Sequence, residues 1–188
     1  MEKETFVYYE TLKNRYPNVR ILTWKKEFNY SAINNFAVRE AQGEYLLFLN
    51  NDVEIITENW LEEMLQLCQQ KDVGMAGAKL YYPDDTIQHA GVVVGLGGVA
   101  AHVLCKLPRD AEGYMGRLRC VQEISAVTAA CMMVKTSVFK AVGGFDEELK
   151  VAFNDIDLCM KVRKYGVKIV FTPYAEPVSY THLTLPTT

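Results

Sequence analysis

The chain has 188 residues, of which 49% are hydrophobic and 23% are charged, and its formal net charge is −3 at pH 7. This composition fits one globular domain with a substantial core, and the lack of a basic surplus argues against nucleic acid as a partner. The five cysteines are scattered without a CxxC pair. The sequence therefore predicts neither a zinc site nor a disulfide framework, and it favours a cytoplasmic protein with reduced thiols.

No targeting or membrane-spanning segment is expected. The first residues lack the apolar stretch of a signal peptide. The longest nearly uncharged run, residues 90–105, is shorter than the ~20 residues that a membrane span needs. Peripheral association with a membrane, such as the inner face of the cytoplasmic membrane, stays open.

Helical and strand patterns alternate along the chain, which predicts an α/β domain with a mostly parallel sheet flanked by helices. Ser31 and Thr57 are the expected N-caps, and Gly43 and Gly166 the expected C-terminal glycines. Residues 84–123 are glycine-rich and are expected to be irregular. The helices are predicted at 4–15, 31–42, 57–70, 137–142 and 153–165, and the strands at 19–24, 45–49, 73–82, 128–136 and 167–173.

The last residues change character and are rich in Thr and Pro without periodicity. We expect residues 1–176 to form the domain and residues 177–188 to be a tail outside the fold.

A carboxylate follows the apolar run at 45–49. Asn50, Asn51 and Asp52 stand where that predicted strand ends, and ligands of open α/β sheets bind beyond the carboxyl ends of the strands. Hard oxygen ligands there suit Mg²⁺ or Mn²⁺. The alternative is ordinary turn chemistry between two elements.

A second set of carboxylates lies at the start of the predicted helix at 153–165. Asp155 and Asp157 lie in its first turn, where the helix dipole favours acids in any case. Asp157 and Lys161 are spaced to form an i, i+4 ion pair, and residues two apart project from different sides of a helix. Asp155 is therefore the candidate to face a cleft as a general base.

Several blocks in the right order carry a resemblance. INNFAVREAQGEYLLFLNND, SAVTAACMMVK, VGGFDEE and AFNDIDLCMKVRKYG resemble family 2 glycosyltransferases with the GT-A fold. The resemblance covers residues 4–176. It implies that the chain moves a sugar from a nucleotide-diphosphate-sugar, such as a UDP- or dTDP-sugar, to a hydroxyl of a glycan or lipid-linked glycan with inversion.

The resemblance also assigns the two carboxylates. Asn50 to Asp52 match the DxD motif of the family with Asn50 in place of the first acid, so Asp52 would hold the divalent cation. Asp155 matches the general base, and Asn154 stands in place of the acid before it.

Other matched positions are expected at the donor or acceptor, together with Asn51 and Asn154. Each has a structural alternative: a solvated amide at Asn35, close sheet packing at residues 128–130, and structural histidines at 89 and 102. These additional candidates are Asn35, His89, His102, Thr128, Ala129 and Ala130.

The chain departs from the family pattern at both ends. It begins within the helix that follows the first strand of the family, so we expect the first βα unit to be missing and strand edges to be left unpaired. His182 lies in the expected tail, so the metal-binding histidine of the family is not assigned to it. We expect slow catalysis by this chain alone.

Two other functions remain open from the sequence. Gly95, Gly97 and Ala100 fit a G-x-G-x-x-A dinucleotide fingerprint, although Pro108 interrupts the long helix that the motif should open. A non-catalytic nucleotide- or glycan-binding module on a transferase scaffold is favoured by the loss of the acid at Asn50.

Overall fold

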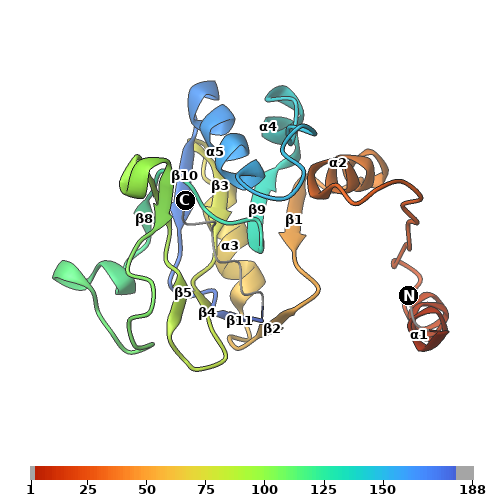
Figure 1. Cartoon of the computed structure of the whole chain (residues 1–188), viewed down its shortest axis with the longest axis horizontal. Coiled ribbons are helices and arrows are strands. Elements are labelled where there is room, and N and C mark those ends of the chain that lie inside the picture. Colours follow the sequence, from red (N-terminus) through yellow and green to blue (C-terminus); the bar gives the residue numbers. More distant parts are fainter. Residues whose placement is uncertain (1–2, 181–188) are drawn as a thin grey trace.

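Helices cover both faces of a five-stranded sheet in the computed structural model, which describes residues 3–180 (Figure 1). The helices are α1 (Lys3–Arg15), α2 (Tyr30–Glu40), α3 (Trp60–Gln69), α4 (Thr136–Ala141) and α5 (Asn154–Tyr165), with 3₁₀ helices η1 (Leu96–Gly98) and η2 (Tyr114–Arg119). The strands are β1 (Tyr45–Leu49), β2 (Val53–Ile55), β3 (Val73–Gly77), β4 (Leu80–Tyr81), β5 (Ile87–His89), β6 (Val92–Val94), β7 (Ala100–His102), β8 (Gln122–Glu123), β9 (Cys131–Lys135), β10 (Lys168–Phe171) and β11 (Pro177–Ser179).

The main sheet is mixed in direction. Its order is β1-β9-β3-β10-β8, and β9 is antiparallel to both β1 and β3, while β3 and β10 are parallel. Thus β1, β3 and β10 run in one direction and β8 and β9 in the other. The predicted α/β fold is confirmed, but the expectation of a mostly parallel pairing is wrong, because a buried apolar run reads the same for either strand direction.

Alternate residues of β9 supply two separate cores. Met132 and Val134 belong to the core that includes α4 and α5, whereas Cys131 and Met133 belong to the core under α3. This period-2 division is the usual consequence of a pleated strand between two helical layers. The five cysteines are all free thiols.

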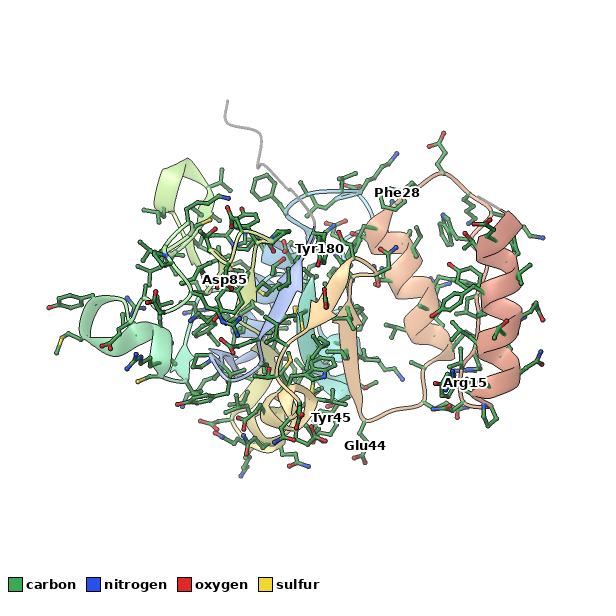
Figure 2. All side chains as sticks on the ribbon, turned by 90° about the horizontal axis from the view of Figure 1, so that it is seen from below. Arg15, Phe28, Glu44, Tyr45, Asp85 and Tyr180 are labelled. Atoms are coloured by element: carbon green, nitrogen blue, oxygen red, sulfur yellow. The ribbon has the colours of Figure 1, made fainter. Side chains whose placement is uncertain are left out.

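The first helix, α1, lies on the far side of α2 from the sheet (Figures 1 and 2). Its apolar side chains at Phe6, Val7 and Tyr8 are more than half exposed. The predicted strand at 19–24 is absent, because this connection, in which exposed and half-buried residues are equally frequent, pairs with no strand among residues 3–180. An extended segment needs such a partner for its backbone groups.

Both predicted caps of α2 are wrong. Asn29, not Ser31, caps α2 by accepting the Ala32 N–H at 2.9 Å, while the buried Ser31 hydroxyl donates to the Leu149 carbonyl at 2.6 Å. The helix ends before Gly43, with Ala41 as its C-cap. A cap-type residue taken up by a long-range partner cannot be recognised from its type alone.

Further along the chain, Asn59 precedes α3 in place of the predicted Thr57, whose hydroxyl instead accepts the Glu176 N–H at 2.8 Å. The expected strand at 73–82 divides into β3 and β4, which belong to different sheets. The expected C-terminal glycine Gly166 is confirmed, with φ of 99° at the end of α5.

The predicted tail begins too early. Pro177–Ser179 form β11, which pairs with β2 and β4 in a second sheet of order β2-β11-β4-β5. Ser179 is fully buried there. The remaining tail residues, 181–188, including His182, lie outside the described residues.

Between β5 and β9, the glycine-rich segment contains a β6–β7 hairpin with η1 at its tip. Gly95, Gly97 and Ala100 belong to this hairpin and do not begin a long helix. The interpretation of this motif as a dinucleotide-binding fingerprint is therefore wrong. Within residues 3–180, none of the helices has the length and apolar character that crossing a membrane requires.

Candidate active site

A pocket of about 400 Å³ opens where the end of β1, the start of β9, the start of α5 and the end of β7 converge. Its wall is mostly apolar, with two amides, two hydroxyl groups, one imidazole and one carboxylate between the apolar side chains. The pocket is lined by Phe28, Tyr30, Asn50, Val92, Ala100, Ala101, His102, Thr128, Ala129, Ala130, Val151, Ala152, Phe153, Asn154, Asp155 and Ile156.

Antiparallel pairing brings two of the predicted segments together. Leu49 lies opposite Cys131, and the Asn50 N–H donates to the Ala130 carbonyl at 3.0 Å. The residue after β1 and the residues before β9 therefore form one wall of the pocket. Thr128, Ala129 and Ala130 are all in this wall, and their assignment to the sugar or the acceptor stays a prediction.

Asp155 is half-buried at the start of α5. Its two carboxylate oxygens accept hydrogen bonds from the N–H of Ala129 at 3.3 Å and from the N–H of Ile156 at 2.9 Å. Desolvation by the surrounding protein raises the pKa of this carboxyl, although these hydrogen bonds and the nearby His102 oppose the rise. A carboxylate with a raised pKa is a better proton acceptor than an ordinary surface aspartate.

Asn154 is almost fully buried beside it. The Asn154 Oδ1 accepts the N–H of Asp155 at 2.8 Å, while Nδ2 has no hydrogen-bond partner within the described chain. The preceding Phe153 adopts a left-handed conformation, with φ of 62°. A non-glycine residue in this conformation is strained and persists only where the surrounding structure holds it. Such residues cluster at functional sites.

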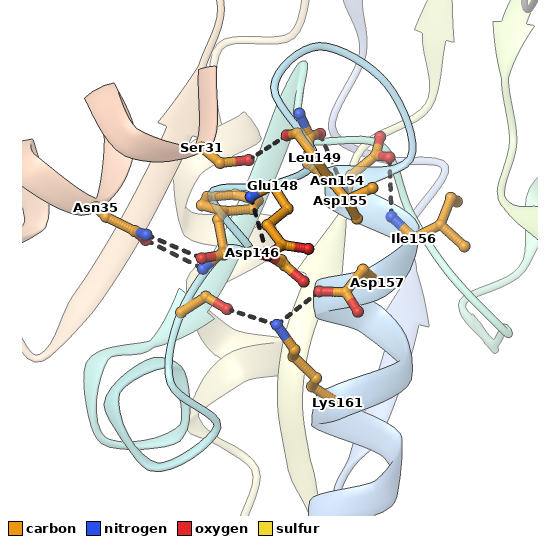
Figure 3. Close-up of polar contacts among 12 residues, drawn as sticks. Ser31, Asn35, Asp146, Glu148, Leu149, Asn154, Asp155, Ile156, Asp157 and Lys161 are labelled. Atoms are coloured by element: carbon orange, nitrogen blue, oxygen red, sulfur yellow. Dashed lines mark hydrogen bonds and ion pairs between the residues drawn. The ribbon is translucent and has the colours of Figure 1, made fainter. Parts of the chain in front are cut away.

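Asp157 points away from the pocket, as predicted. Its carboxylate forms an ion pair with Lys161 at 2.7 Å along the same helix (Figure 3). Lys161 also lies 3.5 Å from the Gly144 carbonyl. The one-turn spacing places this pair on a different side of α5 from Asp155.

Asn35 lies outside the pocket wall. Its Nδ2 donates to the Phe145 carbonyl at 2.9 Å, and its Oδ1 accepts the Phe145 N–H at 3.1 Å, which ties α2 to the loop before α5 (Figure 3). In this structure the side chain has a structural role. Its assignment to the donor stays a prediction.

Asn51 and Asp52 occupy the turn between β1 and β2 and are not among the pocket-lining residues. Asp52 is half-buried, and its carbonyl accepts the Tyr180 N–H at 2.9 Å. Across residues 3–180, no group of three or more His, Cys, Asp or Glu side chains could hold a metal by itself. A cation here would need oxygen ligands from its substrate and from water, which Mg²⁺ commonly uses.

The two predicted histidines are in direct contact. His89 is fully buried, and its Nδ1 lies 2.8 Å from Nδ1 of His102, which lines the pocket. The Thr128 N–H donates to His89 Nε2 at 3.5 Å. The structure therefore connects β5, β7 and the segment before β9 through this pair.

The sequence reasoning missed the aromatic side of the pocket. Phe28 and Tyr30 flank the start of α2, and the Tyr30 hydroxyl donates to the Ala129 carbonyl at 3.3 Å. Burial, followed by the charge of Asp155, raises the pKa of Tyr30, so this phenol stays neutral. The sequence feature that could have indicated this wall is the pair of aromatic residues on either side of Asn29, the N-cap of α2.

Solved structures identify the class of fold. GalNAc-T7 in complex with UDP, GalNAc and Mn²⁺ is 14% identical with a TM-score of 0.72, over 94% of this chain and 35% of that one. The mannosyltransferase PcManGT from Pyrobaculum calidifontis, in complex with GDP-Man and Mn²⁺, is 15% identical with a TM-score of 0.66, over 95% and 45%. The fold is that of the GT-A glycosyltransferases.

A family model described as "Glycosyltransferase like family" matches residues 10–184, and the chain belongs to this family. The resemblance to family 2 glycosyltransferases is thereby confirmed.

Two curated relatives extend this result. Uncharacterized protein y4gI of Sinorhizobium fredii is 51% identical over 94% of this chain and 20% of its own length. The O-antigen biosynthesis protein RfbC of Myxococcus xanthus is 41% identical over 83% of this chain and 12% of its own length. The chain thus spans a small part of both relatives.

Proposed function

We propose that this protein transfers a sugar from a nucleotide-diphosphate-sugar to a hydroxyl group of a glycan acceptor, with inversion at the anomeric carbon. The observation that carries this proposal is the position of Asp155. Its half-buried carboxylate faces a mostly apolar pocket in a chain of the glycosyltransferase family. Apolar walls with a few polar groups suit the mixed faces of a sugar ring.

Asp155 is the general base in this proposal. The acceptor hydroxyl loses its proton to the carboxylate as its oxygen forms a bond to the anomeric carbon, and the bond to the nucleoside diphosphate breaks on the opposite side. The backbone N–H groups of Ala129 and Ile156 orient the carboxylate. The raised pKa of Asp155 suits it to accept a proton near neutral pH.

Asp52 is the proposed protein ligand of a divalent cation, Mg²⁺ or Mn²⁺, with Asn51 beside it at the donor. One carboxylate in a turn fits a cation that takes its other ligands from diphosphate and water. When bound, the cation offsets the negative charge on the departing nucleoside diphosphate. Support comes from the Mn²⁺ in both structural neighbours.

The remaining proposed contacts are divided by position. His102, Asn154 and residues 128–130 line the pocket and are proposed to touch the sugar or the acceptor. His89 contacts His102 from the interior, and Asn35, which bonds to Phe145, keeps its proposed assignment to the donor. The UDP and GDP-Man of the neighbours support a nucleotide-sugar donor, with a UDP- or dTDP-sugar as the first candidates.

RfbC, which is named for O-antigen biosynthesis, supports a surface glycan as the product. We therefore propose a glycan or lipid-linked glycan acceptor, used in the cytoplasm or at the inner face of the membrane.

The test of the donor site is calorimetric titration of UDP, dTDP and GDP into the protein, with and without Mn²⁺. We expect one nucleotide to bind in a metal-dependent manner and Asp52→Ala to lose the metal dependence. Asn51→Ala, which removes the neighbouring amide without touching the carboxylate, is the matched control and keeps the metal dependence. Nucleotide binding without any effect of Mn²⁺ or of Asp52→Ala contradicts the metal site.

A second assay, which supplies nucleotide-sugars and glycan acceptors and follows the release of nucleoside diphosphate, separates the transferase from a non-catalytic binding module. A module binds the nucleotide but releases no nucleoside diphosphate from its sugar conjugate in the presence of acceptors. The structural reason to retain this second candidate is that the described residues place one acidic side chain, not two, in the turn that follows β1.

A further inference from the structure

His89 and His102 form a polar connection between the interior and the pocket. His89 is fully buried at the end of β5, and His102 is half-buried at the end of β7. Their rings are nearly perpendicular, at 82°, and their Nδ1 atoms are 2.8 Å apart. At this distance one Nδ1 must carry a hydrogen and the other must accept it.

The backbone of Thr128 decides which atom carries the hydrogen. The Thr128 N–H can only donate, and it points at His89 Nε2 in a long hydrogen bond of 3.5 Å. His89 Nε2 must therefore lack a hydrogen, so neutral His89 carries its hydrogen on Nδ1 and donates it to His102 Nδ1. Neutral His102 then carries its own hydrogen on Nε2.

The His102 Nε2–H is available to a ligand. Nδ1 is turned toward His89, and within residues 3–180 no hydrogen bond joins His102 Nε2 to another residue. His102 lines the same pocket as Asp155, and the charge of Asp155 acts on the pKa of His102. Beside Asp155, the buried Asn154 Nδ2 is a second donor without a partner in the described chain.

We propose that His102, with its tautomer fixed by His89, is a specificity-determining residue that donates its Nε2–H to an acceptor-sugar hydroxyl next to the one activated by Asp155. The inference rests on the proposed function. One carboxylate with a hydrogen-bond donor nearby matches a pair of neighbouring hydroxyls, of which one gives up a proton and the other accepts a hydrogen bond. The substrate class is therefore an acceptor sugar with vicinal hydroxyl groups.

Both histidines are expected to be neutral during this step. Burial lowers the pKa of His89, with a further contribution from His102, and burial lowers the pKa of His102 against the opposing effect of Asp155. The other titratable groups that act on Asp155 or are acted on by it are Tyr30 of α2 and Cys159 of α5. Both have raised pKa values and stay uncharged at neutral pH.

The first arm of the test needs no ligand. The protein contains three histidines, and long-range ¹H–¹⁵N spectra at pH 7.5 distinguish the protonated nitrogen of each ring. Signals are assigned by their loss in His89→Asn and His102→Gln. We expect His89 with hydrogen on Nδ1 and His102 with hydrogen on Nε2, and the opposite tautomer of His102 overturns the proposal.

Two His89 variants test the tautomer lock. His89→Asn keeps an amide N–H near the place of Nδ1 and is expected to keep the His102 tautomer. His89→Leu removes the donor and is expected to shift His102 partly to the Nδ1–H form. An unchanged His102 tautomer in a folded His89→Leu protein overturns the role assigned to His89.

The second arm measures binding of a panel of methyl hexosides and methyl 6-deoxyhexosides in the presence of UDP and Mn²⁺. His102→Leu is expected to weaken binding of the best glycoside roughly 3- to 10-fold, the usual effect of one neutral hydrogen bond. His102→Gln, which retains a donor near Nε2, should recover part of this loss. A monodeoxy glycoside that lacks the neighbouring hydroxyl should bind wild type and His102→Leu equally.

The outcomes separate the two proposals. Equal binding of every glycoside by wild type and His102→Leu, with transfer still dependent on Asp155, overturns the inference and leaves the proposed function intact. Absence of glycoside binding and of transfer in the wild-type protein overturns both.

Discussion

The Asp155 carboxylate accepts the Ala129 N–H at 3.3 Å, which joins the first turn of α5 to the segment before β9. The contact fixes a carboxylate at the pocket wall. The same surroundings disfavour its charge, because desolvation raises the pKa of Asp155. Function and stability are therefore opposed at this residue.

The first prediction follows from this opposition. An unfolded Asp has a pKa of about 3.9, and the folded pKa is higher. The folded state thus holds its proton more tightly, and its stability falls as pH rises from the unfolded pKa through the folded pKa. In Asp155→Asn the side chain at this position has no proton to lose. The difference in melting temperature, variant minus wild type, should therefore increase between pH 4 and pH 8.

Thermal unfolding across this pH range measures the difference. Asp157→Asn is the control at the neighbouring acid, where the change removes the ion pair with Lys161. A difference between Asp155→Asn and wild type that stays constant or decreases with pH contradicts the raised pKa.

The second prediction concerns two consecutive glycines before α5. Gly143 and Gly144 both have positive φ, at 84° and 70°. A Cβ at Gly144 would lie 2.8 Å from Asn35 Oδ1, whereas one at Gly143 would meet nothing within 4 Å. Gly143→Ala should cost about 1–2 kcal/mol from its backbone conformation, and Gly144→Ala should cost about 1–3 kcal/mol more from the added overlap.

Urea unfolding of the two variants provides this comparison. Equal free energies of unfolding for Gly143→Ala and Gly144→Ala would show that the close approach of Asn35 to Gly144 has no energetic weight.

The third prediction tests the structural role of Asn35. Both ends of its amide bond to the backbone of Phe145, so Asn35→Ala should reduce the free energy of unfolding by about 1–3 kcal/mol. The exposed Gln42 just after α2 provides a control substitution, Gln42→Ala, which should change stability by less than about 0.5 kcal/mol. If Asn35→Ala is as stable as Gln42→Ala but loses nucleotide affinity, the donor-binding role is correct instead.

The pattern of the sequence predicted α3 well because this helix buries an apolar stripe. Met64, Leu67 and Cys68 of α3 are buried together, and their spacing is visible in the sequence. Strand direction was not predictable, because β9 joins β1 and β3 through contacts between residues far apart in the chain. Ser31 illustrates the same difficulty for caps, since its partner Leu149 is 118 residues away.

The candidate site was predictable to a similar extent. Helix geometry alone separates Asp155 from Asp157, and the structure agrees. The contact between His89 and His102 depends on the connection between β5 and β7, and no local pattern encodes their distance. Tyr30 was missed because a tyrosine at a helix start reads as ordinary packing until its hydroxyl is seen to bond Ala129.

The most direct test of the account is sugar transfer by Asp155→Asn beside Asp157→Asn and wild type. UDP-, dTDP- and GDP-sugars are supplied with Mn²⁺ and methyl glycosides, with the protein in excess so that slow transfer is measurable, and release of nucleoside diphosphate is followed. The account predicts a loss of about 10²- to 10⁴-fold in Asp155→Asn, with nucleotide binding retained, and transfer near the wild-type rate in Asp157→Asn. Equal rates in Asp155→Asn and wild type would contradict it.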